Sequence, residues 1–169
     1  MNENTILDQL VYDPADGKLT YRDIRYVIIR PETIVGFQKA IEQHSRKSAR
    51  DALFQGGYQG GYLSAQKFKE MQNLSDTQTI NFMMTMGAEI GWGHFELIEY
   101  DFESHNLQIR VNHSAFAEAY GDATEGVCHL INGVLSGLAT VLFRRNCKGS
   151  ETRCLAKGDT HCLFHISEK

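Results

Sequence analysis

Two stretches of the chain alternate apolar and polar residues, which is the pattern of a strand with one buried face. They cover residues 94–101 (HFELIEYD) and 107–113 (LQIRVNH), and a short turn lies between them. A further pair of strands is predicted at 150–156 and 161–166, on either side of a turn at Gly158. The pattern therefore predicts two antiparallel β-hairpins in the second half of the chain.

Three helices are predicted in the first half of the chain, from apolar residues at helical spacing. Pro31 begins the first helix, because its missing N–H costs nothing in the first helical turn. The apolar face of this helix consists of Ile34, Phe37 and Ile41. The second helix runs from about residue 45 to 71, and the third from a cap at Asp76 to the glycine-flanked turn at 91–93.

The longest apolar segment predicts a helix over residues 125–145, with Thr124 as its N-cap. This helix is apolar on most sides, so we expect it to be central and buried. Cys128 would lie in its first turn, where the polarity of a helix N-terminus lowers a thiol pKa.

Four glycines interrupt the second predicted helix, in the run FQGGYQGGY from Phe54 to Tyr62. Each glycine costs a helix about 1 kcal/mol relative to alanine, so their presence needs a reason. Either another helix approaches closely along small residues at i and i+4, or the bare backbone leaves room for a ligand. Both interpretations stay open at this point.

The N-terminal residues are more polar. Residues 1–16 end in a turn cluster at 13–17, and two short strands are predicted around Leu19–Tyr21 and Tyr26–Ile29. The start of the chain lacks the basic and apolar pattern of a signal peptide, and no segment has the ~18 apolar residues that span a bilayer. We therefore expect a cytoplasmic protein with no membrane partner.

Composition narrows the class of function. The chain has 169 residues, 42% of them apolar, with a net charge of −4 and a pI near 6.0. These values suit one soluble domain and argue against a nucleic-acid partner, which normally requires a basic face. In a reducing cytosol the four cysteines are expected to be free or metal-bound rather than paired as disulfides.

The cysteines lie close to the C-terminus. Cys154 and Cys162 stand four residues to either side of Gly158, so an antiparallel hairpin would bring their thiols together. Glu151 lies three residues before Cys154, and a regular strand would put those two on opposite faces. A bulge or bend is therefore required if both are to reach one metal ion.

Three thiolates and one carboxylate can fill a closed tetrahedral zinc site, which is the structural type. Cys128, Glu151, Cys154 and Cys162 form such a set, and the alternative is four free cysteines buried as small apolar groups. Spacing alone leaves other ligands open, namely Cys147, His129, His161 and His165.

The stretch from Gly121 to Phe164 resembles the 4-vinyl reductase domain family. The residues that carry the resemblance are Gly121-Asp122, Val127-Cys128-His129, Gly133 to Gly137, Ala139, Glu151-Thr-Arg-Cys154, Lys157-Gly158-Asp159 and Cys162-Leu-Phe164. Glu151 follows Cys128 by 23 positions, Cys154 follows by 3 more and Cys162 by 8 more. That spacing is similar to the zinc site in the sensor domains of bacterial aromatic-responsive activators, so the resemblance implies Zn²⁺ held by these four residues.

The resemblance further implies a mixed α/β (α+β) fold, with an antiparallel sheet packed against several helices. This fold is related to nitric-oxide sensors and to a trafficking-complex subunit. It implies a homodimer that binds small hydrophobic molecules. The domain would cover residues 25–169, with residues 1–24 as an N-terminal extension.

The sequence departs from the phenol-responsive relatives in two ways. It has no tryptophan ahead of the motif helix, where those relatives hold the ligand hydroxyl, so phenol itself is not implied. The relatives also continue into ATPase and DNA-binding domains, whereas this sequence ends at residue 169, and no built-in output is expected.

A ligand cavity would be lined by the third helix, the first hairpin and the long apolar helix. The candidate lining residues are Phe82, Met83, Met86, Trp92, Phe95, Phe116, Tyr120, Ile131 and Leu135, with His113 as a polar anchor. Each of them could instead be ordinary core or surface. The leading hypothesis is a zinc-stabilised sensor or carrier of hydrophobic or aromatic small molecules. The alternatives are a reductase or accessory factor in tetrapyrrole vinyl reduction, for which no nucleotide-binding motif is present, and a protein-interaction module. An enzymatic role is the less favoured interpretation.

Overall fold

A four-stranded antiparallel sheet forms the base of the protein, and its strands follow the order β4-β5-β7-β6. The strands are β4 (His94–Asp101), β5 (Asn106–Asn112), β6 (Cys147–Arg153) and β7 (Cys162–Glu168). The computed structural model describes residues 4–169. Both predicted hairpins are confirmed, as is the predicted mixed α/β fold with an antiparallel sheet and several helices.

The alternation along β5 sets which face of the sheet is buried. Leu107, Ile109 and Val111 are fully buried, while Gln108 and Arg110 between them are partly exposed. Phe164 and Ile166 of β7 lie opposite them in the register and are also fully buried. The sheet thus presents a continuous apolar face to the helices.

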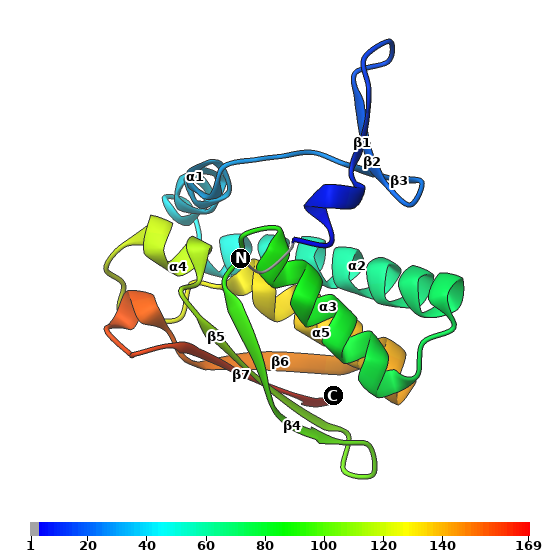
Figure 1. Ribbon diagram of the computed structural model, residues 1–169. Coiled ribbons are helices and arrows are strands. Elements are labelled where there is room, and N and C mark those ends of the chain that lie inside the picture. The colour runs from blue at the N-terminus through cyan, green and yellow to red at the C-terminus, as the bar shows by residue number, and fades with distance from the viewer. Residues whose placement is uncertain (1–3) are drawn as a thin grey trace.

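Helices cover that face in two layers (Figure 1). α5 (His129–Phe143) packs on the sheet, and α2 (Arg46–Gln72) packs on α5. The remaining helices are α1 (Pro31–Glu42), α3 (Asp76–Glu89) and α4 (Ala115–Tyr120). The first three predicted helices are confirmed, but the N-cap of α3 is Ser75 and not Asp76, because Ser75 and Gln78 form a reciprocal capping box.

The approach of α2 to α5 explains half of the glycines in α2. A Cβ on Gly57 would lie 2.2 Å from the Leu130 carbonyl oxygen, and a Cβ on Gly61 would lie 2.2 Å from that of Val134. Gly133 and Gly137 of α5 meet the backbone of α2 in the same way. Bare backbone on both helices therefore permits their contact, as the first of the two interpretations proposed.

The apolar helix begins later than the predicted range 125–145, because tertiary contacts hold its first residues outside the helix. The helix starts at His129, and Cys128 is its N-cap rather than part of its first turn. The N–H of Cys128 donates to the Glu151 carboxylate at 3.0 Å. Gly126 lies so close to that carboxylate that a Cβ there would be 2.5 Å from its oxygen.

A second, three-stranded sheet precedes the helices and projects from the body of the protein (Figure 1). It consists of β1 (Val11–Asp13), β2 (Lys18–Tyr21) and β3 (Ile24–Tyr26), and it follows the short 3-10 helix η1 (Leu7–Gln9). β1 falls in a segment for which no strand was predicted. Tyr21 is buried against Phe68 of α2, with ring centroids 5.9 Å apart, and this contact anchors the sheet.

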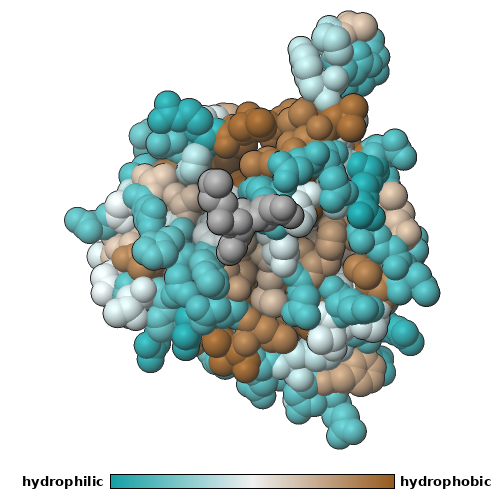
Figure 2. All heavy atoms as spheres, viewed as in Figure 1, coloured by the Kyte–Doolittle hydropathy of each residue, from teal (hydrophilic) through white to brown (hydrophobic). Residues whose placement is uncertain are grey.

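The predicted strand at Tyr26–Ile29 ends early, at Tyr26. Val27, Ile28 and Ile29 instead form an extended connection to α1, with Ile28 85% exposed. Figure 2 shows apolar surface over this connection. The predicted domain boundary between residues 24 and 25 falls within β3, and the division into extension and domain stays a prediction. Along residues 4–169, no helix combines the length and apolar character that a membrane span requires.

Candidate metal centre and apolar cavity

The fold brings the four predicted metal ligands together. Cys128 caps α5, Glu151 lies on β6, Cys154 follows β6 and Cys162 begins β7. Their ligand atoms all lie within 4.8 Å of one another, and the three cysteines are buried. All three cysteines are free thiols, so the cluster is not a disulfide.

The bulge that the sequence required is present in β6. The pairing of β6 with β7 shifts register between Glu151 and Arg153, so the strand carries one extra residue there. This shift turns Glu151 to the same side as Cys154, although three positions separate them. The N–H of Cys154 then donates to the Asp159 carboxylate at 2.8 Å, which fixes the turn that follows.

The geometry of the cluster fits a tetrahedral metal ion. The sulfurs of Cys128 and Cys162 are 3.7 Å apart. Two thiolates on a tetrahedral zinc, each about 2.3 Å from the metal, lie about 3.8 Å apart. Glu151 Oε2 accepts a hydrogen bond from Cys128 N–H, whereas its buried Oε1 has no hydrogen-bond partner among residues 4–169. A cation would satisfy that oxygen.

The electrostatics of the cluster also call for a cation. Burial, followed by the neighbouring Cys154, raises the pKa of Glu151 to about 8. Hydrogen bonds with Cys154 and Cys162 are the main causes that raise the pKa of Cys128. Hydrogen bonds from the Cys128 and Cys162 thiols lower the pKa of Cys154, so it carries the negative charge. A divalent ion would allow the other groups to ionise as well, since metal ligands bind in their deprotonated forms.

Hydrogen bonds from outside the cluster orient two of the sulfurs. The hydroxyl of Ser114, which is completely buried, lies 3.3 Å from Cys128 Sγ. The N–H of Leu155 donates to Cys162 Sγ at 3.4 Å. Contacts of this kind fix ligand geometry in metal sites.

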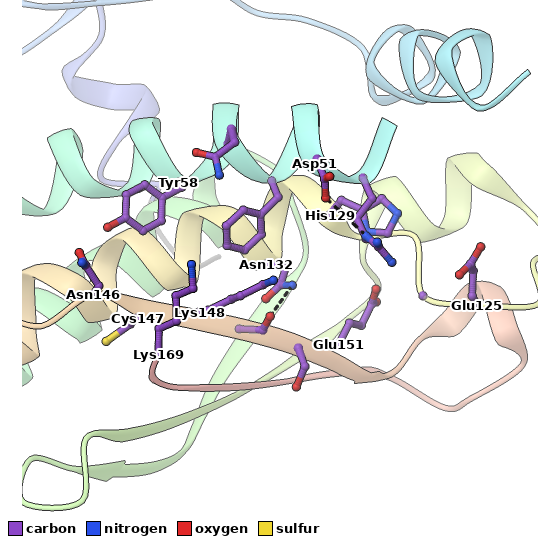
Figure 3. Close-up of a pocket in the computed structure, with 16 residues that line it drawn as sticks. Asp51, Tyr58, Glu125, His129, Asn132, Asn146, Cys147, Lys148, Glu151 and Lys169 are labelled. Carbon is purple, nitrogen blue, oxygen red and sulfur yellow. Dashed lines mark hydrogen bonds and ion pairs between the residues drawn. The ribbon is translucent and has the colours of Figure 1, made fainter. Parts of the chain in front are cut away.

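The four alternative ligands lie elsewhere. Cys147 and His129 line a polar groove bounded by α2, α5 and β6 (Figure 3). His161 contacts the hydroxyl of its neighbour Thr160, and His165 is hydrogen-bonded to Gln108. The described residues thus offer a cluster with Glu151, and not one of these four, as the companion of the three cysteines.

A second feature is an apolar cavity of about 170 Å³ among α2, α3, α5 and the start of β4. It is lined by six of the predicted ligand-binding residues: Met83, Met86, Trp92, Phe95, Ile131 and Leu135. α5 forms one wall of the cavity and is capped by the metal-site residue Cys128 at its N-terminus. The two sites therefore share a helix.

Two of the remaining predicted residues lie near the cavity but outside its lining. Phe116 packs edge-on against Trp92, with ring centroids 5.1 Å apart, and so supports the cavity wall from behind. Phe82 packs on Phe68, at 4.9 Å between centroids, in the separate apolar cluster that holds the N-terminal sheet.

The other two lie away from the cavity. The Tyr120 hydroxyl donates to Glu42 at 2.6 Å, and burial together with this contact raises the pKa of Tyr120 to about 12. The side chain of His113 is 86% exposed and forms an ion pair with Glu118 at 3.4 Å. His113 is therefore not among the residues that line the cavity.

Sequence reasoning missed part of the lining. Tyr26 reaches the cavity from the N-terminal sheet, and Gly60 and Ser64 reach it from α2. The glycine run was one available signal, since a bare backbone beside a ligand was the second interpretation of it. No local pattern indicated Tyr26, because the contact joins segments about 60 residues apart.

The features described so far define a class of protein: an α+β domain with a Cys₃Glu cluster that holds its C-terminal hairpin beside an apolar cavity. Residues 107–168 match the model of the 4-vinyl reductase domain family, so the resemblance seen in the sequence is confirmed and the chain carries a domain of this family. The chain is 22% identical over 167 residues to the phenol regulator MopR of Acinetobacter guillouiae. That match covers 93% of this chain and spans 30% of the length of MopR.

Solved structures show the same fold. The phenol-responsive sensory domain of the transcription activator PoxR, solved with phenol, superposes with a TM-score of 0.84 at 15% identity, covering 96% of this chain and 86% of that one. A vinyl-4-reductase family protein of Methanocaldococcus jannaschii gives 0.58 at 15% identity, covering 88% and 85%. A trafficking-complex subunit of Naegleria fowleri gives 0.57 at 12% identity, covering 82% and 95%. The expected relation to trafficking subunits is thus confirmed at the level of fold.

Proposed function

We propose that this chain is a zinc-stabilised sensor domain that binds a small hydrophobic or aromatic molecule in the cavity beside α5. The observation that carries the proposal is the cavity itself, which has about 170 Å³ of space and an almost wholly apolar lining. An engineered apolar cavity of about 150 Å³ is large enough to bind benzene. The likeness to phenol-responsive sensory domains supports the same type of ligand.

Zinc has a structural role in this proposal. Three sulfurs and one carboxylate complete a tetrahedron and leave no open position for a substrate. The ion would join the β6–β7 hairpin to the N-terminus of α5, and α5 supplies Ile131 and Leu135 to the cavity. Zinc would thus hold one wall of the ligand site in position.

Native mass spectrometry of the purified protein tests both parts of the proposal. We expect one zinc ion per chain, released on denaturation, and an increase in mass when toluene is added to the folded protein. Metal-free protein of equal thermal stability would contradict the role of zinc. Failure of toluene, indole and phenol all to bind, by mass spectrometry and by ligand-detected NMR, would contradict the ligand role.

We further propose that the protein forms a homodimer through the extended connection Val27–Ile29. These three β-branched side chains are exposed, with Val27 at 76% and Ile28 at 85%. Exposed, extended apolar segments invite pairing with another chain. Sedimentation velocity should report a dimer for the wild type and a monomer for Ile28→Glu. Met71→Glu, at an exposed apolar position near the end of α2, is the control and should stay dimeric.

A further inference from the structure

The four glycines of α2 divide into two pairs with different surroundings. Gly57 and Gly61 contact the backbone of α5, as described above. Gly56 and Gly60 lie on another face of the helix, and a Cβ at either position would have no atom of the described residues within 4 Å. Packing within residues 4–169 therefore does not explain Gly56 or Gly60, although each of them weakens the helix relative to alanine.

One of the two unexplained glycines lies at the cavity. Gly60 is exposed and also lines the cavity, so it stands where the cavity meets the solvent. Ser64, one helical turn further on, lines the same side. Tyr26 of the N-terminal sheet lines the cavity as well, and its hydroxyl lies 3.8 Å from Met86 Sδ. Gly56 is equally exposed but is not part of the lining.

The lining also restricts the charge of a ligand. Among the described residues, the lining contains no Asp, Glu, Lys, Arg or His, and its side-chain polar groups are the hydroxyls of Tyr26 and Ser64. An ionised group in such surroundings would lose its water without gaining a countercharge. His113, the polar anchor expected from the sequence, is exposed to solvent and outside this lining.

We infer that Gly60 determines the size of ligand that the cavity admits, and that the ligand is an uncharged compound with a single ring. The inference rests on the proposed ligand-binding function and specifies its selectivity. The absent side chain of Gly60 leaves the mouth open between α2 and Tyr26. Any larger residue at this position would project into the space through which a ring substituent extends.

Binding of three fluorinated probes, measured by ¹⁹F NMR on the zinc-loaded full chain, tests the inference. The probes are fluorobenzene, 1-fluoro-4-propylbenzene and 4-fluorobenzoate. We expect the wild type to bind the first two and not the charged benzoate. Gly60→Ala should weaken binding of the propyl probe at least threefold, and Gly60→Leu should weaken it at least tenfold, with a smaller effect on fluorobenzene.

Gly56→Ala and Gly56→Leu are the matched controls, because they place the same side chains in open space on the same helix. They should bind both neutral probes within twofold of the wild type. Gly60→Ala and Gly56→Ala should both raise the melting temperature, so weaker binding by Gly60→Ala would not reflect unfolding.

The outcomes separate the inference from the function on which it rests. If the wild type binds neither neutral probe, the proposed function itself fails. If the wild type binds them and Gly60→Leu binds them equally well, Gly60 has no role in selectivity. Binding of 4-fluorobenzoate as tight as that of fluorobenzene would overturn the assignment to uncharged ligands.

Discussion

The hydroxyl of Ser136 accepts a hydrogen bond from the backbone N–H of Gly149 at 2.8 Å. Ser136 lies in the middle of α5, and Gly149 lies on β6, the edge strand of the sheet. Asn132 and Thr140, one helical turn to either side, make the same kind of contact. Asn132 donates to the Gly149 carbonyl at 3.1 Å (Figure 3), and Thr140 accepts from Cys147 N–H, also at 3.1 Å. A polar stripe on an apolar helix thereby satisfies the backbone of the edge strand, which would otherwise be open to pairing.

Replacing Ser136 with alanine should therefore destabilise the protein. The buried N–H of Gly149 would lose its acceptor, and an unsatisfied buried donor costs about 1–3 kcal/mol. Urea denaturation followed by circular dichroism measures the loss. Ser150→Ala, an exposed position on the same strand, should change the free energy of unfolding by less than about 0.5 kcal/mol. Equal stability of the Ser136→Ala variant and the wild type would contradict the role given to this contact.

The contact between α2 and α5 predicts opposite effects for neighbouring glycines. Gly61→Ala would place a Cβ 2.2 Å from the Val134 carbonyl oxygen, so the helices must separate. Overpacking of this kind costs about 1–3 kcal/mol. Gly56→Ala meets no atom of the described residues and should instead stabilise the helix by up to about 1 kcal/mol. Thermal melts of the two variants check the difference in sign, and a stabilised Gly61→Ala would show that the helices are not in close contact.

Loss of one cluster cysteine should remove the metal and destabilise the fold. Cys154→Ala leaves two thiols and a carboxylate, which cannot close a tetrahedral site. Loss of a metal belongs to the small group of changes that can cost more than about 4–5 kcal/mol. Elemental analysis and a thermal melt measure both effects. Cys147→Ala, at a buried cysteine outside the cluster, should keep one zinc per chain. A stable, zinc-loaded Cys154→Ala protein would disprove the ligand assignment.

Ser114 provides a test of the environment around the metal. Its hydroxyl contacts Cys128 Sγ and also caps α4 by accepting from Ala117 N–H. Ser114→Ala should lower zinc affinity by about 10–100-fold, the range known for partners of metal ligands. Competition with a chromogenic chelator measures the affinity. Ser75→Ala removes a comparable cap from α3 without touching a sulfur, so it should lower stability and leave zinc affinity unchanged.

The strands could be predicted because their patterns are local. Alternation along residues 107–113 reports directly which side chains face the core, and β5 follows it. The period of two along a strand also required a bulge between Glu151 and Cys154, and the register shift lies at that point. The start of α5 could not be predicted in this way. The carboxylate of Glu151 holds Cys128 at the end of the helix, and 23 positions separate the two residues.

The sequence by itself determined the secondary structure, the family and the four residues of the Cys₃Glu cluster. These properties follow from periodicity and spacing, which involve neighbours along the chain or motifs of fixed length. Only the tertiary structure decided that Tyr26 and Gly60 line a cavity with Met83, that His113 is exposed to solvent, and that Ser136 covers the edge of β6. These contacts depend on how closely α2, α3 and β6 approach α5. That approach results from the packing of all side chains together and leaves no local pattern along the chain.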